Sequence, residues 1–277
     1  SLVDYTDRNT CILFGDGAGA VLVLLGVESA LGPDVRTLGH GAAALFFSVG
    51  LVWRGWRVAG WAALSAGALA IAHALSSELI GPTLAGTLPL WAGLLILAGT
   101  AILLFSASTV IRRGNASLSI TEALSASSVI AALTGVFVAL SWIASGKAGV
   151  TLDAFTETSL QVLALMAAGL TLLPRVHETP GLIGAWRGHV LLGLGLAYAL
   201  VSPGLGINPW WGGAGRAVIN GMAILNPLAI AFAAPAALAF MAANRLYTRQ
   251  RLFGRVYAAA GAVLALLWTV LEIRRAL

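Results

Sequence analysis

Eight long stretches without a single Asp, Glu, Lys or Arg dominate this chain. They are rich in Leu and Ala, have no alternating polar face, and most approach the roughly 20 apolar residues that a helix needs to cross a bilayer. The whole chain is only 10% charged, whereas a soluble domain carries about 25% charged residues. The sequence therefore predicts an all-α integral membrane protein, a bundle of about eight transmembrane helices with a short non-membrane N-terminal segment. The uncharged stretches are Thr37–Trp53, Val58–Ser77, Leu79–Ile111, Ala123–Gly146, Thr158–Pro174, Gly188–Gly215, Ala217–Asn244 and Val256–Leu271.

Prolines adjust the expected helix ends within these stretches. Pro82 and Pro89 move the start of one helix to about Leu88, because Pro is tolerated only in a first turn or at a kink. A second helix is expected to end just before Pro203, since the residue that precedes a proline avoids the α region.

Basic residues between the stretches predict the orientation of the chain. With eight spans, successive loops alternate between the two sides of the membrane, and ten basic residues fall on one side against five on the other, with Arg8 as a sixth if the N-terminal segment does not span. Lys and Arg are enriched in cytoplasmic loops, so the first side is predicted to be cytoplasmic and the C-terminus to lie outside. The ten are Arg54, Arg57, Arg112, Arg113, Arg175, Arg187, Arg245, Arg249, Arg251 and Arg255; the five are Arg36, Lys147, Arg216, Arg274 and Arg275.

This pattern predicts a multi-pass protein of the bacterial cytoplasmic (inner) membrane. Its partners are then the lipid bilayer and other membrane subunits. The arginines lie singly or in small groups between apolar runs, which is typical of membrane orientation and does not favour nucleic acid as a partner.

The N-terminal segment has a different character. A run of β-branched and aromatic residues leads into Gly15-Asp16-Gly17-Ala18-Gly19, whose glycines permit a turn and close backbone approach. A strand–turn–strand is one interpretation of residues 9–23. A short membrane helix over Ala18–Leu31 is the alternative, although Asp16 and Glu28 bracket only about 11 uncharged residues, fewer than a span needs.

Two motifs in this segment carry a resemblance to a known enzyme family. Asp7-Arg8-Asn9-Thr10-Cys11 and Leu13-Phe14-Gly15-Asp16-Gly17-Ala18-Gly19-Ala20 resemble a segment of β-ketoacyl-acyl-carrier-protein synthase III, a soluble thiolase-fold enzyme. The family's catalytic Cys, His and Asn lie outside the matching segment, and Cys11 is not its nucleophile. The resemblance implies a remnant without catalytic residues, joined by a gene fusion or a mis-assembled reading frame. The absent initiator Met likewise suggests a fragment or a trimmed product.

The rest of the chain resembles a second family. The motifs are Asn226-Pro227-Leu228 at a helix start, the basic loop Asn244–Arg255, and the closing run Leu267–Arg275. They resemble the C-terminal part of large bacterial membrane proteins catalogued only as domain of unknown function 2339. The resemblance implies a membrane location and a C-terminal fragment, and supplies no reaction. We therefore divide the chain into a synthase-like segment, residues 1–34, and a polytopic transmembrane domain, residues 35–277.

Three histidines are the strongly ionisable side chains within the spans, where polar groups are costly and often functional. His73 lies deepest and is the candidate functional residue. It could relay protons or contact a substrate, or it could simply bond a neighbouring helix. His40 and His189 lie near predicted helix ends, where an interfacial position is expected.

No catalytic, cofactor or metal site is predicted. The single Cys11 excludes a Cys-rich metal site, and His177-Glu178 has no second ligand at helical spacing. Asp153 and Glu157 fit the acidic start of a helix.

Three hypotheses for function remain open. The first is a non-enzymatic membrane protein of a cell-envelope assembly. The second is a transporter or channel whose helices are broken at Pro203, Pro227 and Pro235, because broken helices often bind substrate in transporters. The third is a synthase III remnant that lacks its catalytic residues.

Overall fold

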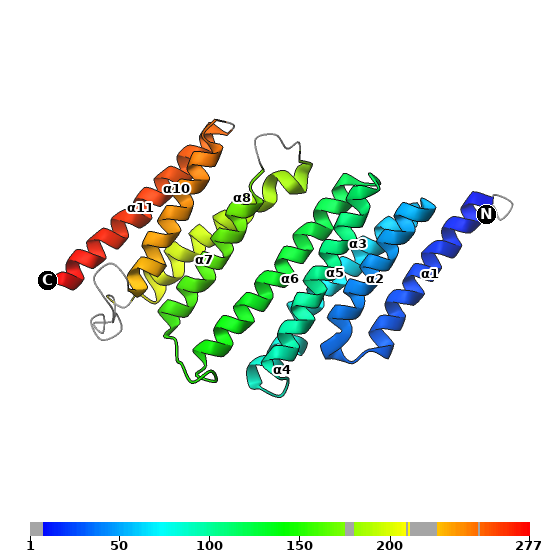
Figure 1. Ribbon diagram of the computed structural model, residues 1–277, viewed down its shortest axis with the longest axis horizontal. Helices are drawn as coiled ribbons and strands as arrows, with labels where there is room; N and C mark the ends of the chain where they lie inside the picture. Colours follow the sequence, from blue (N-terminus) through cyan, green and yellow to red (C-terminus); the bar gives the residue numbers. More distant parts are fainter. Residues whose placement is uncertain (1–7, 175–179, 209, 211–225, 249) are drawn as a thin grey trace. The chain divides into compact units, whose positions relative to one another are not determined.

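The computed structural model describes residues 8–174, 180–208, 210, 226–248 and 250–277, with side chains from Gly17 onward. All regular structure in these ranges is helical, which confirms the all-α part of the predicted fold class (Figure 1). Eight helical segments of the described chain are long and apolar enough to cross a membrane, the number that was expected. They are Pro33–Arg54, Arg57–Ala85, Leu90–Arg113, Leu118–Ala144, Ala154–Leu172, Leu182–Gly206, Ala229–Leu246 and Arg251–Ala276.

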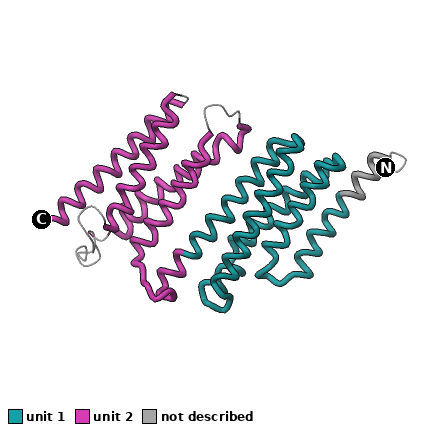
Figure 2. The backbone as a smooth tube through the Cα atoms, in the orientation of Figure 1, with its two compact units in different colours: residues 1–139 teal, residues 140–277 magenta. Residues whose placement is uncertain are grey.

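The chain divides into two compact units, residues 1–139 and residues 140–277 (Figure 2). The first unit contains α1 (Arg8–Ala30), α2 (Pro33–Arg54), α3 (Arg57–Ala74), α4 (Ser77–Ala85), α5 (Leu90–Arg113) and most of α6 (Leu118–Ala144). The second contains α7 (Ala154–Leu172), α8 (Leu182–Ala199), η1 (Leu200–Gly206), η2 (Ala229–Ala233), α10 (Ala234–Leu246) and α11 (Arg251–Ala276).

Small side chains set the packing of the first unit, in which α2 lies against both α3 and α5. On α3, Ala63, Ala66 and Ala70 are fully buried, and Ala44 on α2 is equally enclosed. A Cβ built at Gly41 of α2 would lie only 3.4 Å from the Cβ of Leu103 on α5. In lipid, helices associate mainly through such close packing, because lipid tails are as apolar as the side chains themselves.

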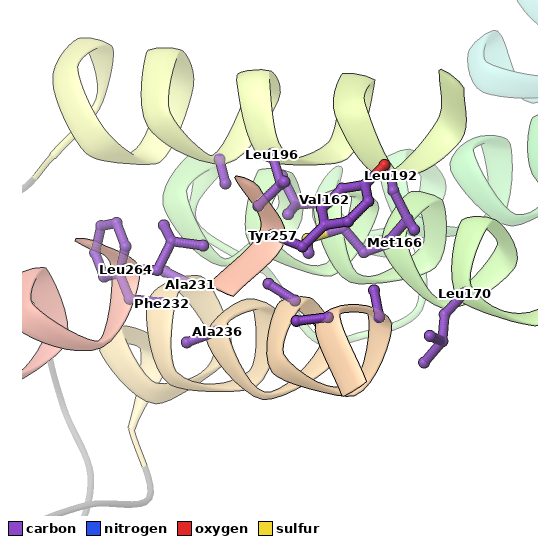
Figure 3. Close-up of a cluster of buried hydrophobic side chains, with 14 of the residues drawn as sticks. Val162, Met166, Leu170, Leu192, Leu196, Ala231, Phe232, Ala236, Tyr257 and Leu264 are labelled. Atoms are coloured by element: carbon purple, nitrogen blue, oxygen red, sulfur yellow. The ribbon is translucent and has the colours of Figure 1, made fainter. Parts of the chain in front are cut away.

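The second unit has a larger core, built from all of its long helices (Figure 3). Phe232 is fully buried there, and its ring centroid lies 6.2 Å from that of Phe155 on α7. Helices α10 and α11 lie side by side, with close approach at two glycines seven residues apart. A Cβ at Gly254 would lie 3.3 Å from the carbonyl oxygen of Ala243, and one at Gly261 would lie 3.2 Å from that of Ala236.

The segment around Pro82 differs from the expectation. The helix was expected to start at about Leu88, but a short helix, α4, precedes it over Ser77–Ala85 with Pro82 inside. One proline in so short a helix removes a single hydrogen bond, the one that the backbone N of residue 82 would donate to the carbonyl of Glu78. Helix α5 begins at Leu90 behind Pro89, two residues after the expected start.

The helix that contains Pro203 also continues further than expected. The α-helix ends at Ala199, but a π-helix, η1, carries the helical path through Pro203 to Gly206. In η1 the N–H of Ile207 donates to the carbonyl of Ser202 at 2.9 Å, five residues back. The wider π-turn accommodates the proline ring, so the expectation that the helix ends before Pro203 was wrong.

The N-terminal segment is a helix rather than a strand–turn–strand. Helix α1 runs from Arg8 to Ala30 through the glycine-rich motif, and its apolar part is Gly17–Ala30. It packs against α2 and α3, so within the first unit this segment contacts the membrane-type helices.

Candidate functional site

A cluster of Glu28, His40 and His73 joins three helices of the first unit. The Glu28 carboxylate oxygen Oε1 accepts from Nε2 of His40 at 2.9 Å and from Nε2 of His73 at 2.7 Å. The two imidazole rings stack in parallel, with centroids 5.4 Å apart and 5° between their planes. One carboxylate oxygen is thus held between two imidazoles.

Local structure explains how these residues meet. Glu28 lies in the last turn of α1, and the chain then turns at Gly32 and enters α2 with Pro33 in its first turn, where Pro is well tolerated. His40 therefore lies two turns into α2, within reach of the end of α1. His73 is the penultimate residue of α3, at the same end of the bundle.

Two further charged side chains border the cluster. Arg36 on α2 lies 3.7 Å from the second oxygen of Glu28 and 3.9 Å from Oε2 of Glu78 on α4. Glu78 Oε2 is also 3.9 Å from Nδ1 of His73. The guanidinium Nε of Arg36 donates to the carbonyl of Leu31 at 3.1 Å, which holds it in place. The cluster and its border thus contain two carboxylates, Glu28 and Glu78, and one guanidinium.

The hydrogen bonds favour the ionised form of Glu28. The bond from His73 lowers the pKa of the Glu28 carboxyl below its ordinary value. Burial has the opposite effect, and the bond from His40 lowers the pKa further. An ionised carboxylate has no proton to donate, so both imidazoles carry a proton on Nε2 in this arrangement. His40 is fully buried, and its Nδ1 has no hydrogen-bond partner among the described residues.

The sequence singled out His73 but missed the site around it. The three side chains come from separate helices, so no local ligand spacing announced them. Their donor atoms nevertheless all lie within 4.8 Å of one another, which makes the three a group that could hold a metal ion. The sequence did hold a signal. Two histidines within apolar spans, His40 and His73, are costly unless they have a partner, and Glu28 is an acidic residue near the end of another apolar helix. His40 is fully buried within the first unit, and its expected position near the membrane interface stays a prediction.

His189 occupies a second polar cluster, in the second unit. Its Nδ1 lies 3.0 Å from the hydroxyl of Tyr257 on α11, and its Nε2 lies 2.8 Å from Oε1 of Gln250. The rings of Trp186 and Phe253 enclose the imidazole, at centroid distances of 6.1 and 4.5 Å. With both nitrogens bonded and 7% of the residue exposed, His189 acts here as a bridge between α8 and α11.

The three predicted helix breaks, Pro203, Pro227 and Pro235, all lie in the second unit. Pro203 is buried inside η1, and Pro235 lies in the first turn of α10, directly after η2. Pro227 follows Asn226, whose side-chain oxygen accepts from the backbone N–H of Leu228 at 2.8 Å. This cap confirms the helix start expected at that motif, since an Asn cap followed by Pro is a typical N-terminal pattern.

The other acidic candidates have structural positions. Asp153 caps α7, with its carboxylate accepting from the backbone N–H of Thr156 at 3.1 Å. Glu157, in the first turn, accepts from the hydroxyl of Ser141 at 2.5 Å. Both agree with the expected acidic helix start. The pair His177-Glu178 lies outside the described residues.

Comparison with known proteins bears on the N-terminal segment alone. The family model described as 3-oxoacyl-(acyl-carrier-protein) synthase III matches residues 1–32. The synthase III of Campylobacter concisus is 50% identical over 44 residues, which are 16% of this chain and 13% of that protein. The synthase III of Gloeobacter violaceus is 58% identical over 43 residues, 15% of this chain and 13% of the relative. Synthase III 2 of Halalkalibacterium halodurans is 86% identical over 22 residues, 8% of this chain and 7% of the relative.

The match is short on both sides. The chain spans about an eighth of the length of the curated relatives it matches first. No solved structure matches the chain. Glu28 lies within the synthase-like residues and His73 lies outside them, so the cluster combines both parts of the sequence.

Proposed function

We propose that the chain is a multi-pass integral protein of the bacterial cytoplasmic membrane, that it is not an enzyme, and that it serves as a subunit of a cell-envelope assembly. The carrying observation is the apolar surface of its eight long helices. In the most apolar 18-residue stretch of each helix, only 22% to 44% of the residues are buried inside the protein. Large side chains such as Trp53 and Trp61 are 83% and 73% exposed. Contiguous apolar surface of this extent suits lipid or other membrane subunits.

The basic residues support a definite orientation. Arg54, Arg57, Arg112 and Arg113 lie at one end of the helices of the first unit, and Arg36 lies at the other. Because basic residues favour the cytoplasmic side, the ends of α2 and α3 that carry the Glu28 cluster face the periplasm.

Fractionation tests the membrane proposal. The chain, expressed in a bacterial host, should stay in the inner-membrane fraction after alkaline carbonate extraction and leave it only with detergent. A peripheral protein of the host, followed in the same gradient, serves as the control that carbonate must release. Release of the chain by carbonate would contradict the proposal.

A transporter or channel is a second candidate, because a specific feature favours it. The second unit contains two π-helical segments, η1 and η2. Pro203 lies inside η1, and Pro235 follows η2 in the first turn of α10. Such segments are rare and often occur at functional sites, and irregular helices in transporters offer backbone groups to substrates. Flux measurements on proteoliposomes that contain the purified chain distinguish the two candidates. Flux of a solute or ion that Pro203→Ala alters would favour the transporter. Vesicles that remain impermeable would favour the assembly subunit.

The synthase-like segment is proposed to be a remnant without acyl chemistry. It covers residues 1–32, and the family's catalytic Cys, His and Asn lie outside the segment that matches. The purified chain should not condense acetyl-CoA with malonyl-acyl-carrier protein. Turnover that survives Cys11→Ser and rises with the amount of chain would show that a catalytic set is present after all.

A further inference from the structure

We propose that Glu28, His40 and His73 bind a divalent transition-metal ion of the Zn²⁺ type. Each residue offers one donor atom, and these atoms lie within 4.8 Å of one another. The three donors come from α1, α2 and α3, so a bound ion would cross-link the synthase-like helix to two membrane-type helices. The inference does not depend on the proposed envelope function.

The donor set suits this class of ion. Two imidazoles and one carboxylate form a recurrent zinc site in which a fourth position is left for water, whereas Mg²⁺ and Ca²⁺ prefer oxygen ligands throughout. Ligand atoms about 2.0–2.1 Å from Zn²⁺ lie roughly 3.3 Å from one another in a tetrahedron. The separations of 2.9 and 2.7 Å between Glu28 Oε1 and the two Nε2 atoms are shorter by about half an ångström, and all three donor atoms lie within 4.8 Å of one another. Side-chain rotation would bring the three donors to the tetrahedral spacing.

Charge around the cluster also favours a cation. Glu28 and Glu78 supply two negative charges, and Arg36 supplies one positive charge that also contacts both carboxylates. With neutral imidazoles, the local charge is therefore negative. When Zn²⁺ binds, the Nε2 proton of His40 and that of His73 must each move to Nδ1 of the same ring, because only the unprotonated nitrogen donates to a metal. Glu78, 3.9 Å from Nδ1 of His73, is placed to orient that ring through its second nitrogen.

Burial gives the cluster a further property of a functional site. His40 is fully buried, so packing holds its ring beside Glu28. Glu28 and His73 keep 31% and 17% of their side chains exposed. An ion can therefore reach the donors without unfolding of the bundle.

Metal binding by the purified full chain tests the proposal. The chain, solubilised in detergent and free of any polyhistidine tag, is stripped with EDTA, titrated with Zn²⁺ or Co²⁺, desalted and assayed for bound metal. The variants are Glu28→Gln and His73→Gln, at partly exposed positions. His189→Gln is the matched control, because it removes a buried histidine from the other unit. Circular dichroism verifies that each variant keeps its helices.

The expected result is one bound Zn²⁺ per wild-type chain and per His189→Gln chain, with excess Mg²⁺ unable to compete. Co²⁺ should give the visible absorption of a four-coordinate site. Glu28→Gln and His73→Gln should weaken binding by more than the 10- to 100-fold that loss of an outer partner of a metal ligand typically costs. Equal binding by wild type and His73→Gln would mean adventitious metal only, and no retained Zn²⁺ in folded wild type would mean a purely hydrogen-bonded cluster. Either outcome overturns the proposal.

Discussion

Replacing Gly188 by Ala tests a close contact between α8 and the backbone of α7. A Cβ at Gly188 would lie 2.8 Å from the backbone N of Leu173, 2.9 Å from the carbonyl carbon of Leu172 and 3.0 Å from the oxygen of Gly169. All three are backbone atoms, so no change of rotamer can relieve the overlap. Because ordinary carbon contacts lie at about 3.5–4.0 Å, the two helices must separate by roughly 0.5–1 Å.

The magnitude follows from two opposing effects. Overpacking of a well-packed contact costs about 1–3 kcal/mol, while exchanging Gly for Ala within a helix gains roughly 0.5–1 kcal/mol. The free energy of unfolding should therefore fall by about 1–2 kcal/mol in Gly188→Ala. Gly193→Ala is the matched control on the same helix, since a Cβ there would meet no atom within 4 Å. That variant should be as stable as wild type or slightly more stable.

The assay is unfolding by SDS in mixed micelles, followed by circular dichroism for wild type and both variants. The order of stability should be Gly193→Ala at or above wild type, and Gly188→Ala clearly below it. Equal stability of the two variants would refute the close packing of α7 on α8. A more stable Gly188→Ala would refute it more strongly.

Three further predictions are checked by the same SDS unfolding or by thermal unfolding in detergent. Asn226→Ala removes a helix cap and a 2.9 Å bond to Glu272, so it should lower the free energy of unfolding by about 1–2 kcal/mol, and an unchanged value would argue against the cap. A double-mutant cycle of His189→Phe with Tyr257→Phe should give a coupling of about 0.6 kcal/mol, up to roughly 1.7, and strict additivity would contradict the bridge between α8 and α11. Zn²⁺ at 100 times its dissociation constant should stabilise the wild type by about 2.7 kcal/mol and should not stabilise His73→Gln, whereas equal stabilisation of both would locate the ion elsewhere.

Much of the fold could be predicted from the placement of charge. The uncharged run Val256–Leu271 lies inside α11, Arg251–Ala276, because a helix that crosses lipid must satisfy its own backbone and cannot carry many charges. The same reasoning located the other spans to within a few residues where the structure describes them. Pro203 was one exception, because a π-turn can absorb a proline that an α-helix cannot, and nothing in the local sequence distinguishes the two outcomes.

The candidate site was only half predictable. His73 was singled out because an ionisable group between apolar residues is costly. Its partners could not be read from the sequence, since Glu28 is 45 residues away on another helix and the contact depends on how α1 packs against α3. The synthase-like motif also pointed away from a helix, because its glycines and β-branched residues favour a turn between strands. In α1 the contacts with α2 and α3 override that local preference.

The location of the two ends of α11 tests the proposed membrane topology most directly. Single cysteines are placed at Thr248, in the exposed turn before the helix, and at Ala276, its last residue, in a Cys11→Ser background. A membrane-impermeant maleimide is applied to intact spheroplasts and to lysed membranes. The predicted result is labelling of Ala276→Cys in intact spheroplasts and of Thr248→Cys only after lysis. Labelling of Thr248→Cys alone in intact spheroplasts would invert the orientation, and labelling of both would show that α11 does not cross the membrane.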